Sequence, residues 1–519
     1  MARKRTTQQK QVTTAQQLAS ITKSCRDIMR KDKGLNGDLD RLPMLTWIMF
    51  LKFLDDTEQL REAEAELAGA RFVPAIEPPY RWRDWAENPA GITGDDLIAF
   101  INQDEAVRSD GTRGQGLFAY LRSLTGENGG DRRDVIATVF RGTVNRMING
   151  YLLRDVINKV SSIHFTSSEE IHTLSHLYES MLKEMRDAAG DSGEFYTPRP
   201  VVKFIVTVCD PRIGEVVLDP ACGTGGFLVE SFEHLKQQEK TTEDYEAIQH
   251  RSLFGGEPKS LPYLLCQMNL LLHGLEFPKI DSGNSLRFRL REIGDVDRVD
   301  VIVTNPPFGG EEERGIQKNF PEDRQVAETA LLFLQLIMRK LRRKHGDQPG
   351  GRCGMVVPNG TLFGAGVAAR IKEDLLREFN LHTIIRLPKG VFSPYTDIET
   401  NLLFFDHGGP TEEIWYYALP LPEGRKQYTK TKPLKFEEFR PVLTWWNNRK
   451  ENEYAWRVSA ADIAANDYNL DVKNPNGKSV ENIREPAEIV ASIISKEQRI
   501  AELMREIQAE IDNGWAGAN

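Results

Sequence analysis

Val216-Val-Leu-Asp219-Pro-Ala-Cys222-Gly223-Thr224-Gly225-Gly226-Phe227 is the stretch of sequence on which the fold depends. It is a β-branched run that ends in an acidic residue and then turns through glycines, which predicts a strand, a tight turn and a helix. Small residues in the turn let a ligand approach the backbone, and the free amides that begin the helix favour a carboxylate or a phosphate. The stretch therefore predicts an α/β unit with a ligand at its turn.

Short β-branched runs alternate with helical stretches from about residue 201 onward. The runs lie at 216–218, 252–254, 299–304, 353–357, 383–387 and 401–405. This alternation predicts a mostly parallel, Rossmann-like α/β sheet with helices on both faces, and ligands at the carboxyl ends of its strands. The chain after the last expected strand, at about Phe405, is short, so an independent domain for recognising a target is hard to place there.

The first part of the chain, from about residue 15 to residue 150, has apolar residues at mixed spacings of three and four, which predicts helices. Four prolines between residues 74 and 89 mark a loop-rich insertion, in which Tyr80, Trp82 and Trp85 are expected to pack as a satellite cluster. Contact of these aromatic rings with bases is the less favoured alternative. A further helix is expected from about Ser167 to Ala189, before the sheet begins.

Composition excludes several classes of protein. The chain has 519 residues, of which 40% are hydrophobic and 28% charged, as in an ordinary globular protein of about three domains. No run is apolar enough for a membrane span and the first residues lack the apolar segment of a secretion signal, so a cytoplasmic location is expected. The five cysteines form no C-x-x-C pair, which favours buried thiols over disulfides or a metal site.

Net charge limits how this chain meets nucleic acid. Its 67 basic and 76 acidic residues give −9, which a protein that grips DNA through phosphate neutralisation alone should not show. Any contact with nucleic acid must be local or shared with a partner. The basic run from Arg339 to His345 could touch phosphates, but the favoured interpretation is the end of an apolar helix, where cations complement the helix dipole.

The chain after Pro486 has an apolar seam with Glu and Lys between its members. The seam consists of Ile489, Ile493, Ile500, Leu503, Ile507 and Ile511. Its seven-residue steps are typical of a short coiled-coil strand, and a helix folded back on its own domain is an equal alternative.

A second motif, Asn305-Pro306-Pro307-Phe308, follows the strand expected at 299–304. Two prolines end a strand and fix the backbone, because proline has no amide hydrogen and a restricted φ angle. Asn305 offers a side-chain oxygen, Pro306 a main-chain oxygen and Phe308 an aromatic face. Two acceptors beside a ring suit a planar group with an amino group, such as a base flipped from its helix. A strand-ending turn with Phe308 in the core is the alternative.

An acidic residue, Glu257, stands at the end of the strand that follows the glycine turn. A carboxylate at this place typically binds a ribose diol, so strand, turn and carboxylate together indicate a nucleoside cofactor. The sequence has neither the usual G-x-G-x-x-G spacing nor a phosphate-binding G-x-x-x-x-G-K loop, which counts against a nucleotide-driven motor. Helix capping by Asp219 and Glu257 is the structural alternative.

These motifs, together with Glu194-Phe-Tyr-Thr-Pro-Arg199, resemble the amino-methyltransferases of DNA, and most closely the modification subunits of type I restriction-modification systems. The order of the motifs matches the group that mainly methylates adenine N6. The resemblance implies S-adenosylmethionine as cofactor and assigns roles to specific residues. A lid over the cofactor would be formed by Glu194, Phe195, Tyr196, Thr197, Pro198 and Arg199. Further cofactor contacts would lie at Asp219, Gly223, Thr224, Gly225, Gly226 and Glu257, and the target adenine would be held by Asn305, Pro306, Pro307 and Phe308. Asn284 stands near the place where the family often has an aspartate facing the cofactor's adenine.

The resemblance also implies direct in-line transfer of a methyl group to the exocyclic nitrogen, without a metal or a covalent intermediate. The sequence has no Pro-Cys dipeptide of the kind used by carbon-5 cytosine methyltransferases, so Cys222 is interpreted as a small residue of the turn. Double-stranded DNA, a specificity subunit, a second modification subunit and a restriction subunit are the implied partners, and no membrane is expected among them.

Three domains are predicted: a helical N-terminal domain over 1–160, the methyltransferase catalytic domain over 161–475, and a helical assembly tail over 476–519. Three competing functions stay open. A self-sufficient adenine-N6 or cytosine-N4 DNA methyltransferase would share every motif. A protein methyltransferase acting on a glutamine amide could use the same pocket, although such enzymes typically carry Tyr where this chain has Phe308. The third is a non-catalytic assembly or DNA-clamping module, against which the intact Asn305 to Phe308 motif speaks.

Overall fold

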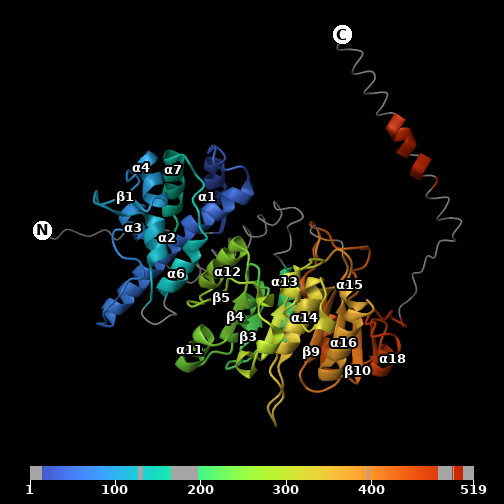
Figure 1. Cartoon of the computed structure of the whole chain (residues 1–519). Coiled ribbons are helices and arrows are strands. Elements are labelled where there is room, and N and C mark those ends of the chain that lie inside the picture. The colour runs from blue at the N-terminus through green and yellow to red at the C-terminus, as the bar shows by residue number, and fades with distance from the viewer. Residues whose placement is uncertain are drawn as a thin grey trace. The chain divides into compact units, whose positions relative to one another are not determined.

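The structure is a computed structural model that describes residues 15–126, 132–164, 197–393, 396, 398–476, 494, 496–498 and 500–505. The chain divides into two compact units, Met1–Asn474 and Pro475–Asn519, and Figure 1 shows the course of both. The predicted boundary at residue 160 lies just before the undescribed residues 165–196, which contain the helix expected at 167–189. The predicted domain limits therefore stay a prediction.

The N-terminal part is helical, as predicted, with one short β-hairpin that the sequence did not predict. Its helices are α1 (Ala15–Met29), α2 (Asp38–Leu67), α3 (Trp82–Trp85), α4 (Gly94–Asn102), α5 (Leu117–Ser123), α6 (Arg132–Arg141) and α7 (Gly150–Ser161). The hairpin consists of β1 (Glu105–Val107) and β2 (Arg113–Gln115), which pair antiparallel.

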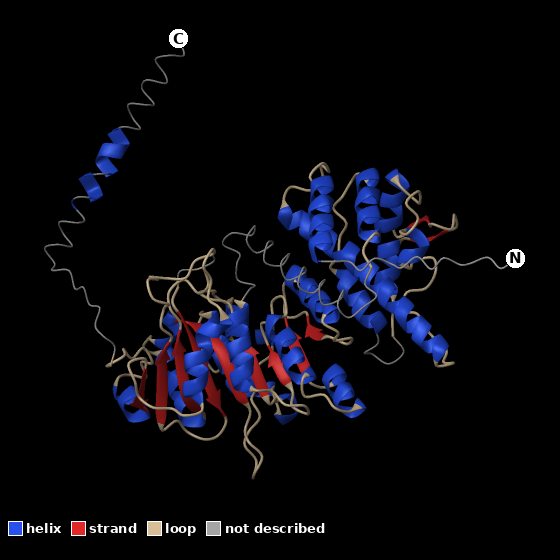
Figure 2. Cartoon of the chain, turned by 180° about the vertical axis from the view of Figure 1, so that it is seen from behind, coloured by secondary structure: helices blue, strands red, loops and turns tan. Residues whose placement is uncertain are grey.

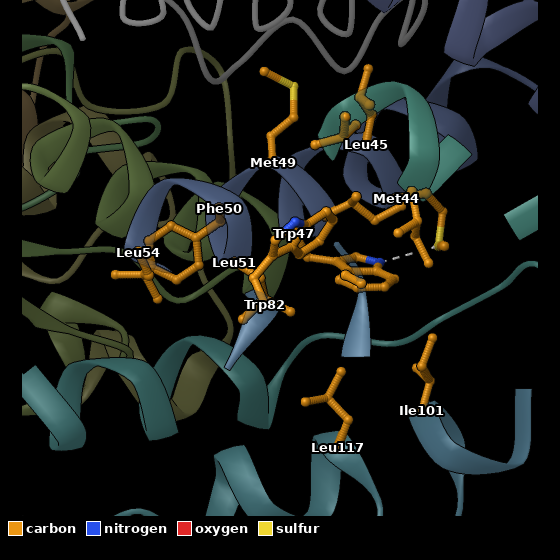
Figure 3. Close-up of a cluster of buried hydrophobic side chains, with 14 of the residues drawn as sticks. Met44, Leu45, Trp47, Met49, Phe50, Leu51, Leu54, Trp82, Ile101 and Leu117 are labelled. Atoms are coloured by element: carbon orange, nitrogen blue, oxygen red, sulfur yellow. Dashed lines mark hydrogen bonds between the residues drawn. The ribbon is translucent and has the colours of Figure 1, made fainter. Parts of the chain in front are cut away.

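Helix α2 is the centre of this part, because its middle residues are buried on nearly all sides (Figure 3). Trp47 packs edge-on against Phe118 and donates its indole hydrogen to the Met44 sulfur at 3.5 Å. Tyr80, Trp82 and Trp85 are buried in the same cluster as α2. Core packing of these rings is thus confirmed, but their expected satellite position is wrong, since they complete the main core.

A nine-stranded sheet forms the second part, in the order β11-β10-β8-β9-β7-β6-β3-β4-β5 (Figure 2). The strands are β3 (Val217–Asp219), β4 (Leu253–Gly256), β5 (Lys279–Asp281), β6 (Val301–Thr304), β7 (Arg352–Pro358), β8 (Asn380–Arg386), β9 (Thr400–Asp406), β10 (Glu413–Ala418) and β11 (Ala455–Ser459). Only β9 and β11 run antiparallel to their neighbours. The mostly parallel α/β sheet predicted from the sequence is confirmed.

Helices cover both faces of this sheet. The helices of this part, including the short α13 and α15 at one edge of the sheet, are α9 (Arg199–Cys209), α10 (Gly226–Lys236), α11 (Thr242–His250), α12 (Ser260–Leu272), α13 (Arg314–Gln317), α14 (Thr329–Lys340), α15 (Asn359–Leu362), α16 (Val367–Glu378), α17 (Arg440–Trp446) and α18 (Ala460–Ala465). Side chains alternate along β6, so Val301 and Val303 join the core formed with α9 and α10, while Ile302 joins the core formed with α14 and α16.

The expectation that the last strand ends at about Phe405 is wrong, because β10 and β11 extend the sheet beyond it. The run Ile414-Trp415-Tyr416-Tyr417 forms most of β10. It is rich in aromatic residues rather than β-branched ones, and aromatic residues favour strands equally well. The remainder of the chain is therefore partly used to widen the sheet.

The basic run from Arg339 to His345 also differs from expectation. Helix α14 ends at Lys340, so only Arg339 and Lys340 lie in its last turn. Residues 342–351 leave the helix as a hairpin, closed by the bonds Gly351 N to Arg342 O at 2.7 Å and Gln348 N to His345 O at 3.1 Å, which projects from the lower edge of the sheet in Figure 1. The interpretation of the whole run as a helix end is wrong for its last four residues.

The helical part and the sheet share a core, because Leu264, Leu265 and Met268 of α12 belong to the same buried cluster as α2. An ion pair between Arg61 and Glu276 joins the same two parts.

In the tail, Ile500 and Leu503 of the expected seam are exposed, while Ile489, Ile493, Ile507 and Ile511 lie outside the described residues. Among the helices described here, none has the length and hydropathy needed to cross a membrane.

Candidate active site

The glycine turn joins β3 to α10, as the sequence predicts. Gly225 precedes the helix with a φ of 83°, a left-handed conformation that favours glycine. A Cβ atom on Gly225 would lie 2.8 Å from the Cys266 sulfur, so the turn has no room for a side chain there. Asn269 of α12 donates to the Thr224 carbonyl at 2.9 Å, which fixes the turn against α12. The amides that begin α10 are thereby fixed in position.

Asp219, the last residue of β3, is almost completely buried. Its Oδ1 accepts hydrogen bonds from the Thr304 hydroxyl at 2.6 Å and from the Ala221 amide at 3.2 Å. Its Oδ2 is buried and has no hydrogen-bond partner among the described residues. Burial raises the pKa of this carboxyl from 3.8 to about 7, against the effect of the two hydrogen bonds. Asp219 thus offers one open acceptor beside the glycine turn.

Glu257 follows β4 and ties that strand end to the glycine turn. One carboxylate oxygen accepts from the Gly223 amide at 3.1 Å, and the other accepts from the Lys259 amide at 2.8 Å, where α12 begins. Burial raises the pKa of this carboxyl, while the two amides lower it. Lys259 is the residue that precedes α12, so Glu257 braces the chain just before this helix and does not cap the amides of its first turn. A carboxylate oxygen has two acceptor sites, so each still has one for a further donor.

Asn305 follows β6 and presents an acceptor of defined orientation. Its amide nitrogen donates to the Thr197 hydroxyl at 2.9 Å. Its Oδ1 is buried and has no hydrogen-bond partner among the described residues. One of the two amide hydrogens is used by Thr197, which fixes the orientation of the amide, and the oxygen remains as an acceptor for a ligand.

Phe308 lies half-buried at the same strand end and packs edge-on against Phe392, with ring centroids 5.5 Å apart. Pro306 is buried and Pro307 is half-buried. The core alternative for Phe308 is correct in part, because one side of its ring packs against neighbours of the core around α9 and α10.

The described half of the expected lid touches both motifs. Thr197 binds Asn305, and Arg199, the first residue of α9, donates to the Gly226 carbonyl at 2.9 Å. Pro198 precedes that helix. Glu194, Phe195 and Tyr196 lie outside the described residues. The structure thus brings three separate stretches of the sequence, around residues 197, 226 and 305, to one place.

Asn284 lies beside this site but uses its side chain locally. Its Oδ1 accepts from the Leu286 amide at 2.9 Å, and its amide nitrogen donates to Glu312 at 3.4 Å. The next residue, Ser285, donates to the Pro220 carbonyl at 2.6 Å, so this segment packs against the start of the glycine turn.

Two residues of the site were missed in the sequence. Thr304 is the last residue of a buried strand and looked like any β-branched residue of the core, yet its hydroxyl binds Asp219. Phe392 follows β8 in Gly390-Val-Phe392, and a glycine followed by an aromatic residue after a strand was the available signal. Both contacts join residues far apart in the sequence.

The assembled side chains fit a nucleoside cofactor with an amino-acid part. The amides of α10 suit a carboxylate, the open oxygen of Asp219 suits a cationic amine, and Glu257 suits a diol. No group of three or more His, Cys, Asp or Glu in the described part of the chain has the geometry to hold a metal ion. All five cysteines are buried free thiols, as predicted.

Comparison with known proteins agrees with this geometry. The family model described as N-6 DNA Methylase matches residues 169–483, and the model described as HsdM N-terminal domain matches residues 18–160. The type I restriction enzyme EcoEI methylase subunit of Escherichia coli is 46% identical to this chain over 96% of this chain and 99% of its own length.

Solved structures give the same result. A Vibrio vulnificus protein described as a type I modification subunit is 70% identical, with a TM-score of 0.86, and the match covers 92% of this chain and 100% of that one. A chain from a study of complex assembly in a type I restriction-modification system is 42% identical, with a TM-score of 0.75 and coverage of 96% and 99%. This chain therefore belongs to the N-6 DNA methylase family and, within it, to the methylase subunits of type I restriction-modification systems, which makes it a DNA methyltransferase.

Proposed function

We propose that this chain transfers a methyl group from S-adenosylmethionine to N6 of an adenine flipped out of double-stranded DNA, as part of a complex that supplies the sequence specificity. The observation that carries this proposal is the Asn305 amide. Its nitrogen donates to Thr197, and its buried oxygen has no hydrogen-bond partner in the part of the chain that the structure describes. An acceptor fixed in this way suits the amino group of a planar base.

The reaction requires that a poor nucleophile become reactive. The lone pair of an exocyclic amine is conjugated with the ring, and two acceptors at Asn305 and Pro306 would draw the amino hydrogens out of the ring plane. The same acceptors would stabilise the positive charge that develops on the nitrogen during transfer. Phe308 would stack on the base, while Phe392 fixes the Phe308 ring from its edge.

The cofactor would be held by the residues that surround the glycine turn. Bound S-adenosylmethionine supplies the methyl group on a sulfonium, which leaves as a neutral thioether. The amides of Gly226 and Phe227 would bind its carboxylate, the free oxygen of Asp219 its ammonium group, and Glu257 its ribose hydroxyls. Arg199, whose guanidinium binds the Gly226 carbonyl, would steady the first turn of α10.

Sequence specificity is proposed to come from partner subunits. The net charge of −9 disfavours a firm grip on DNA by this chain alone. A specificity subunit, a second copy of the methylase subunit and, for cleavage, a restriction subunit are the partners that membership of this family suggests. The similar chain from the study of type I complex assembly supports this arrangement.

The test compares the isolated chain with the chain co-purified with the specificity subunit encoded beside it. Transfer of a radiolabelled methyl group into DNA and methylation-aware sequencing would be measured for both. We expect the isolated chain to bind S-adenosylmethionine but to methylate no specific site, and the complex to methylate one adenine-containing sequence. Methylation of cytosine N4, or robust site-specific methylation by the isolated chain, would contradict the proposal.

A further inference from the structure

Phe363 is a large apolar residue that is exposed, at 47% of its surface, on the edge of the sheet that carries the active site. It follows β7 and the single turn of α15. Strands β6 and β7 are parallel neighbours about 4.8 Å apart and pair as far as Thr304 beside Met355, so the Asn305 motif and the end of β7 lie at the same edge of the sheet. The segment that carries Phe363 therefore begins next to the Asn305 motif. In Figure 1, α13 and α15 lie on this same edge.

The Phe363 segment is tied down on three sides. Thr361 donates to Glu328, just before α14, at 3.1 Å. Asn401 of β9 donates to the Asn359 side chain at 3.1 Å, and the Leu470 amide donates to the Leu362 carbonyl at 2.8 Å. These bonds come from three different parts of the chain, so the segment is held as a fixed platform.

A buried lysine holds the backbone on both sides of Phe363. The Lys372 side chain, on α16, is completely buried, and its ammonium group donates to the Leu362 carbonyl at 2.9 Å and to the Gly364 carbonyl at 3.3 Å. Burying an ammonium group costs several kcal/mol, and burial lowers the pKa of Lys372 to about 8. This costly contact fixes the one backbone position from which Phe363 projects.

The ring of Phe363 stacks on no other ring of the described chain. No other aromatic ring or cation of the described residues packs against Phe363, whereas Phe308 and Phe392 on the same edge pack against each other. Single exposed apolar residues are common on protein surfaces. Phe363 differs from such residues in two ways: its backbone is fixed, and it lies beside the proposed base-binding motif. This combination indicates a function for the exposed ring.

We propose that Phe363 is a wedge that enters the DNA duplex beside the target adenine and fills the stack when that base leaves it, with Lys372 as the residue that positions it. The inference rests on the proposed function of the Asn305 motif. Apolar side chains inserted between base steps unstack them at a cost of a few kcal/mol, and a flipped base leaves a gap of the size of a ring. A rigidly held phenyl ring offsets the loss of stacking in that gap.

The experiment uses the full complex of methylase and specificity subunits, with Phe363→Ala, Lys372→Met and wild type. Two duplexes carry the recognition sequence, one with the target adenine paired and one with an abasic site opposite it, which removes the pairing that opposes flipping. A third duplex carries 2-aminopurine at the target position, whose fluorescence rises when it unstacks. Val296→Ala, at a fully exposed apolar residue before β6 and thus on the opposite edge of the sheet, is the matched control.

Phe363→Ala is expected to lower kcat/KM on the paired duplex by about 10- to 100-fold, the equivalent of a few kcal/mol of lost stacking. On the abasic duplex its activity should return to within about twofold of wild type, because the base is already free to leave. The 2-aminopurine signal should fall in parallel, and Phe363→Trp should restore both. Lys372→Met should show the same pattern in weaker form, while Val296→Ala should behave as wild type.

Three outcomes would overturn the wedge. Equal activity of Phe363→Ala and wild type on the paired duplex is one, and equal loss on both duplexes is another. The third is failure of the Phe363→Ala chain to assemble with the specificity subunit, measured by mass photometry, which would make Phe363 a subunit contact. If wild type itself methylates neither duplex, the proposed function fails, and the wedge fails with it.

Discussion

Asn305 and Glu257 stand at the ends of two strands of one sheet, and their polar groups are used in different ways. Within the described ranges, the side chain of Asn305 binds the protein through its nitrogen, and its buried oxygen has no hydrogen-bond partner. Glu257 binds backbone amides with both of its oxygens. An unpartnered buried acceptor costs stability, so we infer that a substrate completes the bonding at Asn305. The carboxylate of Glu257 therefore also stabilises the fold, because it links the glycine turn to the start of α12.

The comparison predicts the largest loss of activity at Asn305. Asn305→Ala removes the acceptor proposed for the amino group of the base and, from the fold, a single hydrogen bond to Thr197, so methylation should fall by about 10²- to 10³-fold or more. The dissociation constant of S-adenosylmethionine, measured by calorimetry, should stay within about twofold of wild type. Substantial residual methylation by a folded Asn305→Ala complex would break the assignment.

Glu257→Ala should combine a loss of cofactor binding with a loss of stability. The amides of Gly223 and Lys259 lose their acceptor, and an unpaired buried amide costs about 1–3 kcal/mol. We expect S-adenosylmethionine to bind about 10- to 100-fold more weakly and the melting temperature to fall. Lys259→Ala keeps the Lys259 amide and serves as the control. Cofactor binding that is unchanged in a destabilised Glu257→Ala chain would assign Glu257 to the fold alone.

Thr197→Val tests whether the orientation of the Asn305 amide matters. Valine has the shape of threonine but gives the Asn305 nitrogen no acceptor, so the amide can rotate and present either side. We expect kcat to fall by about tenfold, in the range for one hydrogen bond of about 1.4 kcal/mol. Thr197→Ser should restore the rate. A wild-type rate for Thr197→Val would show that the bond to Thr197 is dispensable.

Asp219 should make stability depend on pH. Burial raises its pKa in the folded chain to about 7, from 3.8, so between about pH 4 and pH 7 the folded state binds a proton that the unfolded state has lost. Stability contributed by this group should therefore fall as pH rises through that window, by at most about 1.4 kcal/mol per pH unit for one proton. Urea titrations at several pH values should show a flatter profile for Asp219→Asn, and an identical profile would contradict the raised pKa.

Much of the fold could be predicted because its signals are local. The β-branched runs that became β3, β6 and β7 are continuous in the sequence, and the glycines around residue 225 mark their turn. Strand β5 was not predicted, since Lys279–Asp281 is only three residues long and mostly exposed. Strand β10 has no β-branched run, because aromatic residues form most of it. The basic hairpin after Lys340 was interpreted as a helix end, because cations at the end of an apolar run look the same in both structures.

The sequence by itself determined the fold class, the two strand-end motifs and the family, because each depends on residues that are neighbours along the chain. Only the tertiary structure decided which polar atoms are used up and which remain open. The bond from Asn305 to Thr197 spans 108 residues, and the bond from Thr304 to Asp219 spans 85. Such bonds depend on the order of the strands in the sheet and on side chains meeting at one edge. The same holds for the segment that carries Phe363. The hydrogen bonds that fix it come from strands and helices that are distant in the sequence, and no local pattern predicts that they lie close together.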